Sequence, residues 1–386
     1  MKKTIFYASA LCISLFSANT VAAGDPDTNF DKPTHRSWNV NKPWRVPQDS
    51  TTAMNKPDLY AWQLFVSLNW PVDENKCKPD RDADLGEPGK VVWETWQSRE
   101  ETFLPGAQQP ATWRQGCKQG GFATLPSGDY TVFADEDIRI SKSAYNYIRD
   151  NKLYSLDEQE RLARAGVRDL SFPLGAKTAK AHWVRITEED KPRYHWAEVE
   201  RDGETHIYGV SGFHIVSKDM PTWFWATFEH VDNELRWPQT YPDAFLGWLT
   251  PSRDAAACPP GFLSCNEIPA GLGLEGTKWE NYRLRGTQID WVDNRGTPTS
   301  LANSQLESFM DLETSSCLTC HALAVKGETG DPKPIGFLKD ERNAHGLKLG
   351  FTGPPSPAMF RDENGVEVPY IGLDYVWVLR KAQREE

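Results

Sequence analysis

Apolar residues recur at helical spacing in the stretch "KPDLYAWQLFVSLNWP". Leu59, Trp62, Phe65 and Leu68 follow one another at intervals of three, so they share one face of a helix. Pro71 ends the pattern, because proline cannot continue a helix. The stretch therefore predicts a buried helix that contributes to the core.

A second helical region is predicted over residues 141–166. Its second half carries start and stop signals of its own. Ser155 is followed three residues later by Glu158, which is the pattern of a capping box, and Gly166 is typical of a helix end. We therefore expect a helix with defined ends in this half.

The pattern changes beyond Pro173, where aromatic and β-branched residues become frequent. The runs "AHWVRI", "YHWAEVERDGETHIYGVSGFHIVSK" and "TWFWATFEH" predict strands, and Asp202-Gly203 predicts a hairpin turn between two of them. "WENYRLRGTQIDWVD" at 279–293 predicts a further strand. These segments indicate a largely antiparallel sheet.

Loop signals divide the chain into parts. Residues 24–57 are polar and proline-rich and predict an extended arm. The Gly, Pro, Ser and Thr residues of "NRGTPTS" at 294–300 separate a mixed, sheet-rich domain at 58–300 from a C-terminal segment at 301–386. The expected fold class is α+β, with an antiparallel sheet and flanking helices followed by a small, mostly helical segment.

Two helices are predicted inside the C-terminal segment. One is "LANSQLESFMDLE", which has a helical pattern. The other is the closing stretch "LDYVWVLRKAQREE", with Asp374 as its N-cap and basic residues toward its end. The closing stretch also suits a strand, because Tyr375, Val376, Trp377 and Val378 are aromatic or β-branched.

The first 23 residues have the pattern of a secretory signal peptide. Two lysines precede an apolar stretch at 5–16, and small residues at 21–23 offer a cleavage site. We therefore expect export to the periplasm. No later segment approaches the roughly 18 consecutive apolar residues of a membrane-spanning helix, so no membrane span is expected.

The chain is acidic, with a formal net charge of −11 over 386 residues. Removal of residues 1–23 takes away two lysines and changes the net charge to −13. Nucleic acid is not an expected partner, because binding its phosphates needs clustered Lys and Arg. An acidic surface instead favours a partner protein with a basic docking face.

The cysteines separate into two groups. Cys77, Cys117, Cys258 and Cys265 lie outside any short motif, and thiols tend to pair in an oxidising compartment. Four cysteines allow three connectivities. We favour Cys77–Cys117 together with Cys258–Cys265, the latter across "CPPGFLSC"; the alternative is free buried thiols. A further cysteine, Cys12, is expected to leave with the signal peptide.

The other two cysteines stand beside a histidine in "SSCLTCHALA" at 315–324. Cys317 and Cys320 are separated by two residues, and His321 follows directly. Thiols at this spacing on a helical turn project side by side and can add to the two vinyl groups of a haem, while the imidazole binds the iron. The motif predicts one covalent haem c, held by Cys317 and Cys320, with His321 as the proximal ligand.

Three other interpretations of the motif fit less well. A thioredoxin-type redox pair is expected beside a βαβ pattern, which the sequence does not show. A structural zinc site needs a second pair of ligands at short spacing. A disulfide between Cys317 and Cys320 would close a very tight ring.

With this motif the chain resembles the c-type cytochromes, specifically secreted bacterial proteins that carry one haem. The resemblance covers at most residues 301–386. The phrases "WFWATFEHVDN" and "NYRLRGTQIDWVDNRGTPTSLANSQLESFMDLETSSCLTCH" are also similar to those of large, functionally uncharacterised bacterial proteins that end in a single-haem segment. The resemblance implies attachment through Cys317 and Cys320, proximal ligation by His321, and assembly after export.

The second axial position of the iron is assigned by the same resemblance. In small cytochromes c a methionine from a proline-containing loop commonly binds there. Met359, in "TGPPSPAMFRDENG", is therefore the expected distal ligand, and thioether ligation suits an electron carrier. His345 is the alternative, while Met310 is expected in the core. An open sixth position would favour catalysis.

Two main functions follow from these expectations. The first is a periplasmic electron carrier that passes single electrons to or from a redox partner protein. The second is a haem-dependent oxidoreductase, of peroxidase or oxidase type, with a site for a small-molecule substrate in or against the N-terminal domain. A secreted binding module with haem as a structural staple is a third possibility. The sequence indicates no catalytic residues.

Five histidines of the sheet-rich domain are candidates for a second metal site: His182, His195, His206, His214 and His230. Their separations match no compact zinc or copper pattern. Glu229 and His230 are adjacent, but neighbouring strand residues point to opposite faces, which argues against an acid/base pair. The tryptophans of "PTWFW" are expected in the core rather than around a pocket.

Overall fold

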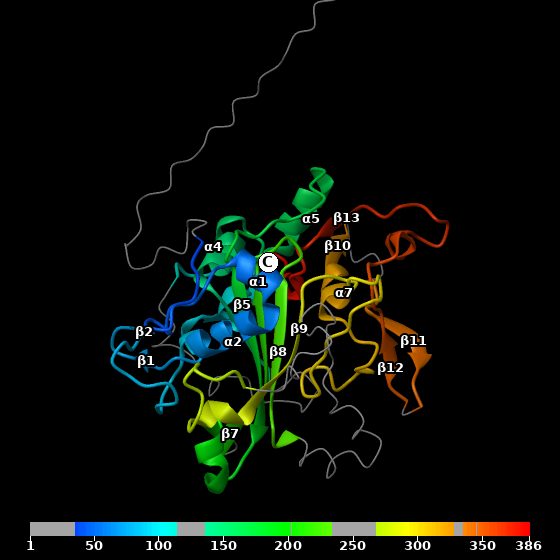
Figure 1. The fold of residues 1–386 in the computed structure, drawn as a ribbon. Coiled ribbons are helices and arrows are strands. Elements are labelled where there is room, and N and C mark those ends of the chain that lie inside the picture. The colour runs from blue at the N-terminus through cyan, green and yellow to red at the C-terminus, as the bar shows by residue number, and fades with distance from the viewer. Residues whose placement is uncertain (1–34, 114–135, 202, 234–267, 328–334, 345) are drawn as a thin grey trace, which may run out of the picture. The chain divides into compact units, whose positions relative to one another are not determined.

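Seven strands form the main sheet, and neighbouring strands are antiparallel (Figure 1). The computed structural model describes residues 35–113, 136–201, 203–233, 268–327, 335–344 and 346–386. The order is β3-β4-β5-β7-β8-β9, and β6 also pairs with β7. The strands are β3 (Gln97–Ser98), β4 (Glu136–Ile140), β5 (Lys177–Arg185), β6 (Trp196–Arg201), β7 (Glu204–Ser217), β8 (Phe224–His230) and β9 (Tyr282–Gln288).

Short strands and helices surround this sheet. The paired short strands are β1 (Val72–Asp73) with β2 (Lys78–Pro79), β10 (Val325–Gly327) with β13 (Tyr370–Gly372), and β11 (Leu338–Arg342) with β12 (Lys348–Gly350). The α-helices are α1 (Ser50–Asn55), α2 (Pro57–Leu68), α3 (Arg99–Thr102), α4 (Lys142–Asp150), α5 (Leu156–Arg164) and α7 (Cys317–Ala322). The 3-10 turns are η1 (Val92–Thr95), η2 (Pro105–Ala107), η5 (Glu188–Arg193), η7 (Lys278–Asn281), η8 (Pro357–Phe360) and η9 (Trp377–Lys381).

The alternation of side chains along β5 gives the sheet two different faces. Ala179, Ala181 and Trp183 are fully buried in one hydrophobic cluster, which we call the first core. Lys180 and His182 stand between them and therefore point to the opposite face, because successive strand residues alternate. Lys180 and His182 thus lie on the face that also carries the C-terminal segment.

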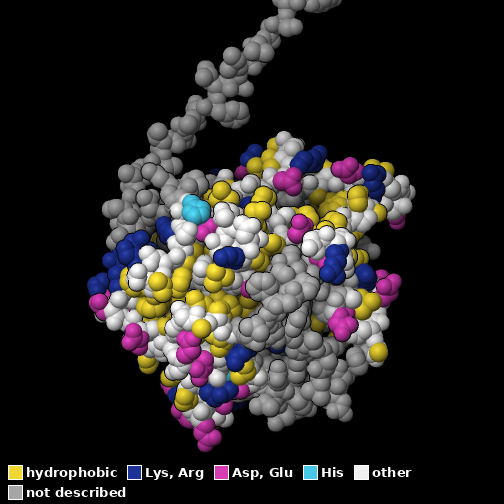
Figure 2. Space-filling model, viewed as in Figure 1, with side chains coloured by type: hydrophobic (Ala, Val, Ile, Leu, Met, Phe, Trp, Pro, Cys, Tyr) yellow, Lys and Arg dark blue, Asp and Glu magenta, His cyan; other side chains and the backbone are white. Residues whose placement is uncertain are grey.

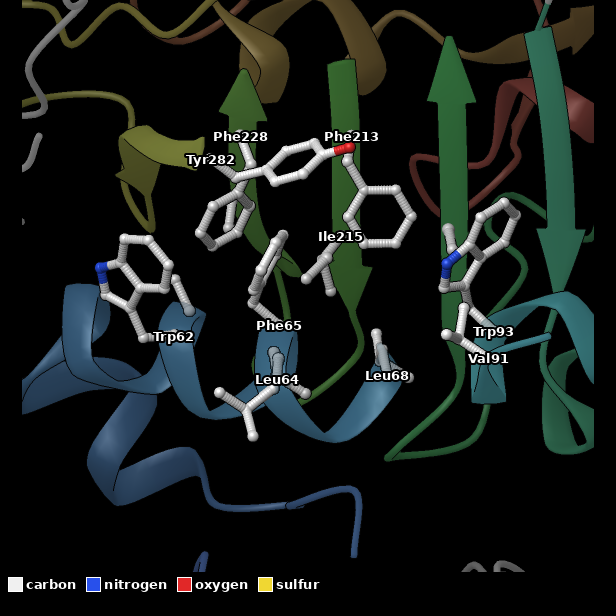
Figure 3. Packing of buried hydrophobic residues seen from close by; sticks show 14 of the residues in the cluster. Trp62, Leu64, Phe65, Leu68, Val91, Trp93, Phe213, Ile215, Phe228 and Tyr282 are labelled. Atoms are coloured by element: carbon white, nitrogen blue, oxygen red, sulfur yellow. The ribbon is translucent and has the colours of Figure 1, made fainter. Parts of the chain in front are cut away.

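Helix α2 packs on the first face of the sheet, where Figure 1 shows it in front of the strands. Phe65 is its central contact, and Figure 3 shows this ring pointing toward Phe213, Phe228 and Tyr282. The centroid of Phe65 lies 4.3 Å from that of Phe228 and 6.2 Å from that of Phe213. The apolar face predicted for this helix therefore forms part of the first core, as expected.

A second hydrophobic cluster, the second core, covers the opposite face. It joins side chains of the sheet to side chains of the C-terminal segment, among them Ile140, Trp225, Leu301, Leu318 and Leu373. Helices α4 and α5 contribute to the same cluster. Residues on both sides of position 300 thus share one core, and residues 33–386 form one compact unit.

The predicted α+β class is confirmed. Helix α5 begins at its N-cap Ser155, whose side chain accepts a hydrogen bond from the Glu158 N–H, and Gly166 follows the helix with φ +85°. The hairpin of β6 and β7 places Arg201 opposite Glu204, with Gly203 in the turn at φ +80°. Asp202 lies outside the described residues. The strand predicted within 279–293 is β9.

The helix predicted for "LANSQLESFMDLE" is wrong, because residues 301–313 form turns and isolated bridges. The beginning of this segment is bound to β8 instead. The side-chain oxygen of Asn303 accepts hydrogen bonds from the N–H groups of Gln305 and Leu306, at 2.9 and 3.2 Å, and its amide donates to Thr227 Oγ1 of β8 at 2.7 Å. Glu229 of β8 accepts from the N–H of Ser304 at 2.6 Å. These bonds hold Asn303 and Ser304 against the sheet.

The predicted closing helix is also wrong. Only the 3-10 turn η9 forms there. Asp374 does not cap a helix, because its carboxylate accepts from the N–H of Phe172 and pairs with Lys218. Asp374 and Tyr375 have φ values of +49° and +65°, which interrupt any helix at this point. The described residues of 301–386 are therefore less helical than expected, with α7 as their only α-helix.

Several predictions fall partly outside the described residues. Cys77 is disulfide-bonded, whereas Cys117, Cys258 and Cys265, and hence the two proposed pairings, lie outside them. The signal peptide and the first part of the 24–57 arm also lie outside; the described part of the arm contains α1, which Asp49 caps. Among the described residues, no helix has the length and apolar character needed to cross a membrane.

Candidate functional site

Helix α7 carries both motif cysteines and the histidine on a single turn and a half. Cys317, Cys320 and His321 occupy positions i, i+3 and i+4, which lie on one face of a helix. Leu318 points elsewhere and is fully buried in the second core. The three motif side chains remain partly exposed.

The end of β9 holds the first turn of α7. Ser316 is the N-cap, and its hydroxyl oxygen accepts from the Thr319 N–H at 3.1 Å. The buried side chain of Gln288 donates to Ser316 Oγ at 2.9 Å and accepts from the Leu318 N–H at 2.9 Å. Gln288 therefore satisfies groups at the helix start and attaches the motif to the sheet.

His321 is bound through only one of its ring nitrogens. Nδ1 lies 2.7 Å from the carbonyl oxygen of Tyr375, so Nδ1 carries the proton and donates. Nε2 has no hydrogen-bond partner among the residues that the structure describes. Burial lowers the pKa of His321 to about 4, so the imidazole is neutral near pH 7, which is the form that binds metals.

Trp225 of β8 packs against the same imidazole. Its ring centroid lies 4.4 Å from that of His321, with the planes inclined at 52°. Trp225 is buried in the second core, and Trp223 beside it is buried as well, which confirms that "PTWFW" packs inside the protein. The contact limits the orientations that the His321 ring can adopt.

The turn that presents the Tyr375 carbonyl has an unusual backbone. Asp374 and Tyr375 both adopt positive φ values, +49° and +65°. For residues other than glycine such conformations cost of the order of 1–3 kcal/mol each and persist only where neighbouring groups impose them. Lys218, which forms an ion pair with Asp374, is one such neighbouring group. Strain of this kind is often found at functional sites.

The two thiols are free, and their surroundings keep them protonated. Burial, together with the negative charge of Glu307, raises the pKa of Cys317 and raises that of Cys320 to about 12. A redox-active cysteine pair instead needs a lowered thiol pKa. The environment therefore disfavours thioredoxin-type chemistry. The Cys317 thiol donates to the carbonyl oxygen of Leu301 at 3.3 Å.

A group of four ionisable side chains, the sheet-face cluster, lies on the second face of the sheet. It consists of Glu136, Lys180, His214 and Glu307, the first three from β4, β5 and β7. Lys180 Nζ is 2.7 Å from Glu136 Oε1, and His214 Nε2 is 3.4 Å from Glu307 Oε2. Glu136 Oε1 and His214 Nε2 are buried without a partner of hydrogen-bond geometry in the described structure.

The sheet-face cluster is close enough to α7 for its charges to act on the motif. In addition to burial, the charges of Lys180 and His214 lower the pKa of His321. Burial opposes ionisation of Glu307, but the charges of His214 and Lys180 outweigh it, so the pKa of Glu307 is lowered and its carboxylate is ionised at neutral pH. The motif therefore lies near partly buried charges of both signs.

Of the two proposed distal ligands, Met359 lies within the described residues and His345 does not. Met359 lies in η8 and is partly buried against the small cluster of Leu323, Val325 and Ile335. The loop before it is tied to the motif, because Thr319 Oγ1 donates to the carbonyl oxygen of Gly353 at 2.7 Å. Met310 is buried in the interior, as expected.

The other histidines have separate partners. His182 Nδ1 bonds to Ser211 Oγ, and His195 Nε2 bonds to Glu94 Oε2. His206 lies within hydrogen-bond distance of Arg185. His230 stacks on Tyr194 at 3.6 Å on the first face, whereas Glu229 binds Ser304 on the second, so this pair does point to opposite faces. No group of three or more His, Cys, Asp or Glu among the described residues is arranged to hold a metal ion.

The donor set of α7 fits a covalently attached haem. Two unpaired thiols would form the thioether bonds, and the neutral imidazole would bind the iron through Nε2. Ligating histidines usually donate their other ring N–H to a carbonyl or carboxylate, and the Tyr375 carbonyl takes that place here. The haem would supply a one-electron redox couple.

Comparisons of the chain with protein-family models, with curated proteins and with solved structures return no match.

Sequence reasoning located the motif but missed its supports. Trp225, Gln288 and Tyr375 contact α7 or its N-cap from distant parts of the chain, at sequence separations of 28 to 96 residues. Asp374 acts through the turn that it shares with Tyr375. None of these residues belongs to a local pattern that marks it as a partner of the motif. Lys180, like the rest of the sheet-face cluster, becomes recognisable only once the strand order is known.

Proposed function

We propose that this protein is a periplasmic c-type cytochrome that carries one covalent haem and passes single electrons to or from a partner protein. Cys317 and Cys320 form the thioether bonds, and His321 is the proximal iron ligand. The observation that carries the proposal is the shared face of these three side chains on α7, combined with the hydrogen bond from His321 Nδ1 to the Tyr375 carbonyl. This bond leaves Nε2 directed to bind iron.

The surroundings of α7 support an electron carrier. The imidazole is held by Trp225 on its ring face and by Tyr375 at Nδ1, so it can keep its orientation when the iron changes charge. Met359 is the proposed distal ligand, supported by the bond that ties its loop to Thr319. Histidine–methionine ligation raises the reduction potential and suits outer-sphere transfer.

The proposed location and partner rest on charge and on the first residues of the sequence. The pattern of residues 1–23 supports export. The acidic chain supports docking to a basic face of the redox partner. On the face shown in Figure 2, acidic and basic side chains are interspersed, so this view does not reveal a single acidic docking patch.

The attachment is tested by producing the full-length chain in a host that attaches haem to exported proteins. We expect the purified wild type to keep its haem on a denaturing gel and to show the mass of one added haem. Cys317→Ser combined with Cys320→Ser should abolish both signals, because no thioether can form. A colourless wild type, or a doubly substituted protein that keeps covalent haem, would overturn the proposal.

The distal ligand has a separate test with a matched control. We expect the ferric protein to show a methionine–iron charge-transfer band that is lost in Met359→Ala and retained in Met310→Ala. Both substitutions shorten a methionine, but Met310 is a core residue whose sulfur accepts from Ser315 Oγ at 3.6 Å. Retention of the band in Met359→Ala would exclude Met359 as the ligand.

The sheet-face cluster favours a second candidate, a haem-dependent oxidoreductase. Buried acid and base groups beside a haem can move protons during the reduction of peroxide or the oxidation of a small substrate. His214 and Glu307 are the pair available for this role, since they lie 3.4 Å apart and act electrostatically on the motif. A high-spin ferric spectrum that shifts on addition of cyanide or peroxide would favour this candidate over the carrier.

A further inference from the structure

The turn at Asp374 and Tyr375 lies between the sheet and α7. On the side of α7, the Tyr375 carbonyl accepts the hydrogen bond from His321 Nδ1 at 2.7 Å. On the side of the sheet, Asp374 Oδ1 is 2.5 Å from Lys218 Nζ, and Oδ2 accepts from the Phe172 N–H at 2.7 Å. The side chains of Lys218 and Asp374 are only 8% and 7% exposed, so this ion pair is little screened by water.

The conformation of this turn depends on these contacts. Both residues have φ values in the left-handed region, +49° for Asp374 and +65° for Tyr375, where residues other than glycine are disfavoured. The carboxylate of Asp374 joins the turn to Lys218, the residue after β7, and to Phe172. The position of the Tyr375 carbonyl therefore depends on the Asp374 side chain.

We propose that Asp374 is a positioning residue for His321, and that its ion pair with Lys218 sets the strength of the hydrogen bond at His321 Nδ1. The inference rests on the proposed function, because it concerns the imidazole as an iron ligand. A well-placed acceptor at Nδ1 makes the imidazole a more basic ligand, which favours ferric over ferrous iron. The pair thus keeps the reduction potential lower than it would be with a displaced carbonyl.

Two substitutions separate positioning from a direct effect of charge. Asp374→Asn removes a negative charge, and Lys218→Met removes a positive one. Acting through space alone, these changes shift the reduction potential in opposite directions, upward for Asp374→Asn and downward for Lys218→Met. Loss of positioning weakens the same hydrogen bond in both variants, so it raises the potential in both.

The experiment measures the midpoint potential of the mature full-length holoprotein at pH 7. We expect the midpoint potential of both variants to rise by up to about 59 mV. For a one-electron couple, 59 mV corresponds to a tenfold change in the equilibrium constant for reduction. Lys177→Met is the matched control. Lys177 is also buried, lies opposite Ser217 in the sheet and pairs with Asp219 at 3.4 Å, but it makes no contact with the turn. Its loss should not raise the potential.

The possible results distinguish this inference from the proposed function. A rise in both variants supports the positioning role. Opposite shifts in the two variants, no shift in either, or an equal rise in Lys177→Met would overturn it while leaving haem attachment intact. A wild-type protein without covalent haem would instead overturn the proposed function.

A measurement on the wild type covers the case in which the variants do not fold. In the reduced protein, labelled at its histidines with nitrogen-15, we expect the His321 Nδ1 proton to be visible by NMR and to exchange slowly with water. The hydrogen bond to the Tyr375 carbonyl is expected to protect this proton from exchange. Exchange as fast as that of an exposed histidine would contradict the inference.

Discussion

His182 and His321 are two histidines whose protonation is controlled by the same face of the sheet. Burial lowers the pKa of each to about 4, and the charge of Lys180 contributes to both shifts. Their partners differ, because His182 bonds to Ser211 Oγ whereas His321 bonds to the Tyr375 carbonyl. In the proposed function a neutral imidazole is the form of His321 that binds iron, while at His182 the neutral form has no role in the site.

His182 provides a test of stability against pH. Its pKa is about 4 in the folded protein and 6.5 for an unperturbed histidine, so the unfolded chain binds the additional proton between these values. Stability should therefore fall as the pH falls from 6.5 to 4. We expect His182→Asn to reduce this loss by about 2 kcal/mol between pH 7 and 4.5, measured by urea unfolding. An equal loss in both proteins would show that His182 does not titrate in this window.

At the scale of the element, α7 is stabilised by its contacts and not by its length. It has six residues, far fewer than the roughly 12–15 that an isolated helix needs to be stable in water. Its first turn is held by Gln288, its Thr319 side chain by the carbonyl of Gly353, and its Cys320 carbonyl by Trp377 Nε1 at 3.1 Å. These neighbours hold the turn and thereby keep Cys317, Cys320 and His321 on one face of α7.

Gln288→Leu tests this dependence. The substitution removes the partner of the Leu318 N–H and of Ser316 Oγ inside the protein, and an unsatisfied buried polar group costs about 1–3 kcal/mol. We expect a loss of stability of that order and a lower yield of covalent haem. Gln63→Leu, on the partly exposed side of α2, is the control and should leave the yield unchanged. Equal yields from both variants would argue against an anchoring role.

At the scale of the whole molecule, the first core and the candidate site lie on opposite faces of the main sheet. The first face carries α2 and a dense group of aromatic rings, whereas the second carries α7 and the sheet-face cluster. Trp225 belongs to β8, as does Phe228, but it points to the face opposite Phe228. One strand therefore supplies both the core and the support of His321.

Phe65→Ala tests this separation. The ring is fully buried among five aromatic neighbours, and truncation of such a side chain typically costs about 3–5 kcal/mol. We expect a loss of that size in denaturant unfolding, with the haem spectrum of the folded fraction unchanged. Met54→Ala, whose side chain is 61% exposed, should change stability by less than about 0.5 kcal/mol. A changed spectrum in Phe65→Ala would show that the two faces are coupled.

Local sequence patterns were sufficient to predict those elements whose formation depends on residues close in sequence. The helical spacing of Leu59 to Leu68, the cap at Ser155 and the strand composition beyond Pro173 each correspond to an observed element. The motif on α7 was recognisable for the same reason, since the chemistry of its three residues depends on their spacing. The haem itself stays a prediction.

Contacts between residues distant in sequence decided the structure of residues 301–313 and of the turn at Asp374. Residues 301–313 have a helical pattern, yet Asn303 and Ser304 bind β8 and keep them in turns. Asp374 is a plausible helix cap in sequence, yet Lys218 and Phe172 bind its carboxylate and hold the turn that presents the Tyr375 carbonyl. Polar groups in a folded chain pair with whatever partner the topology brings near, and that choice is not visible in the hydrophobic pattern.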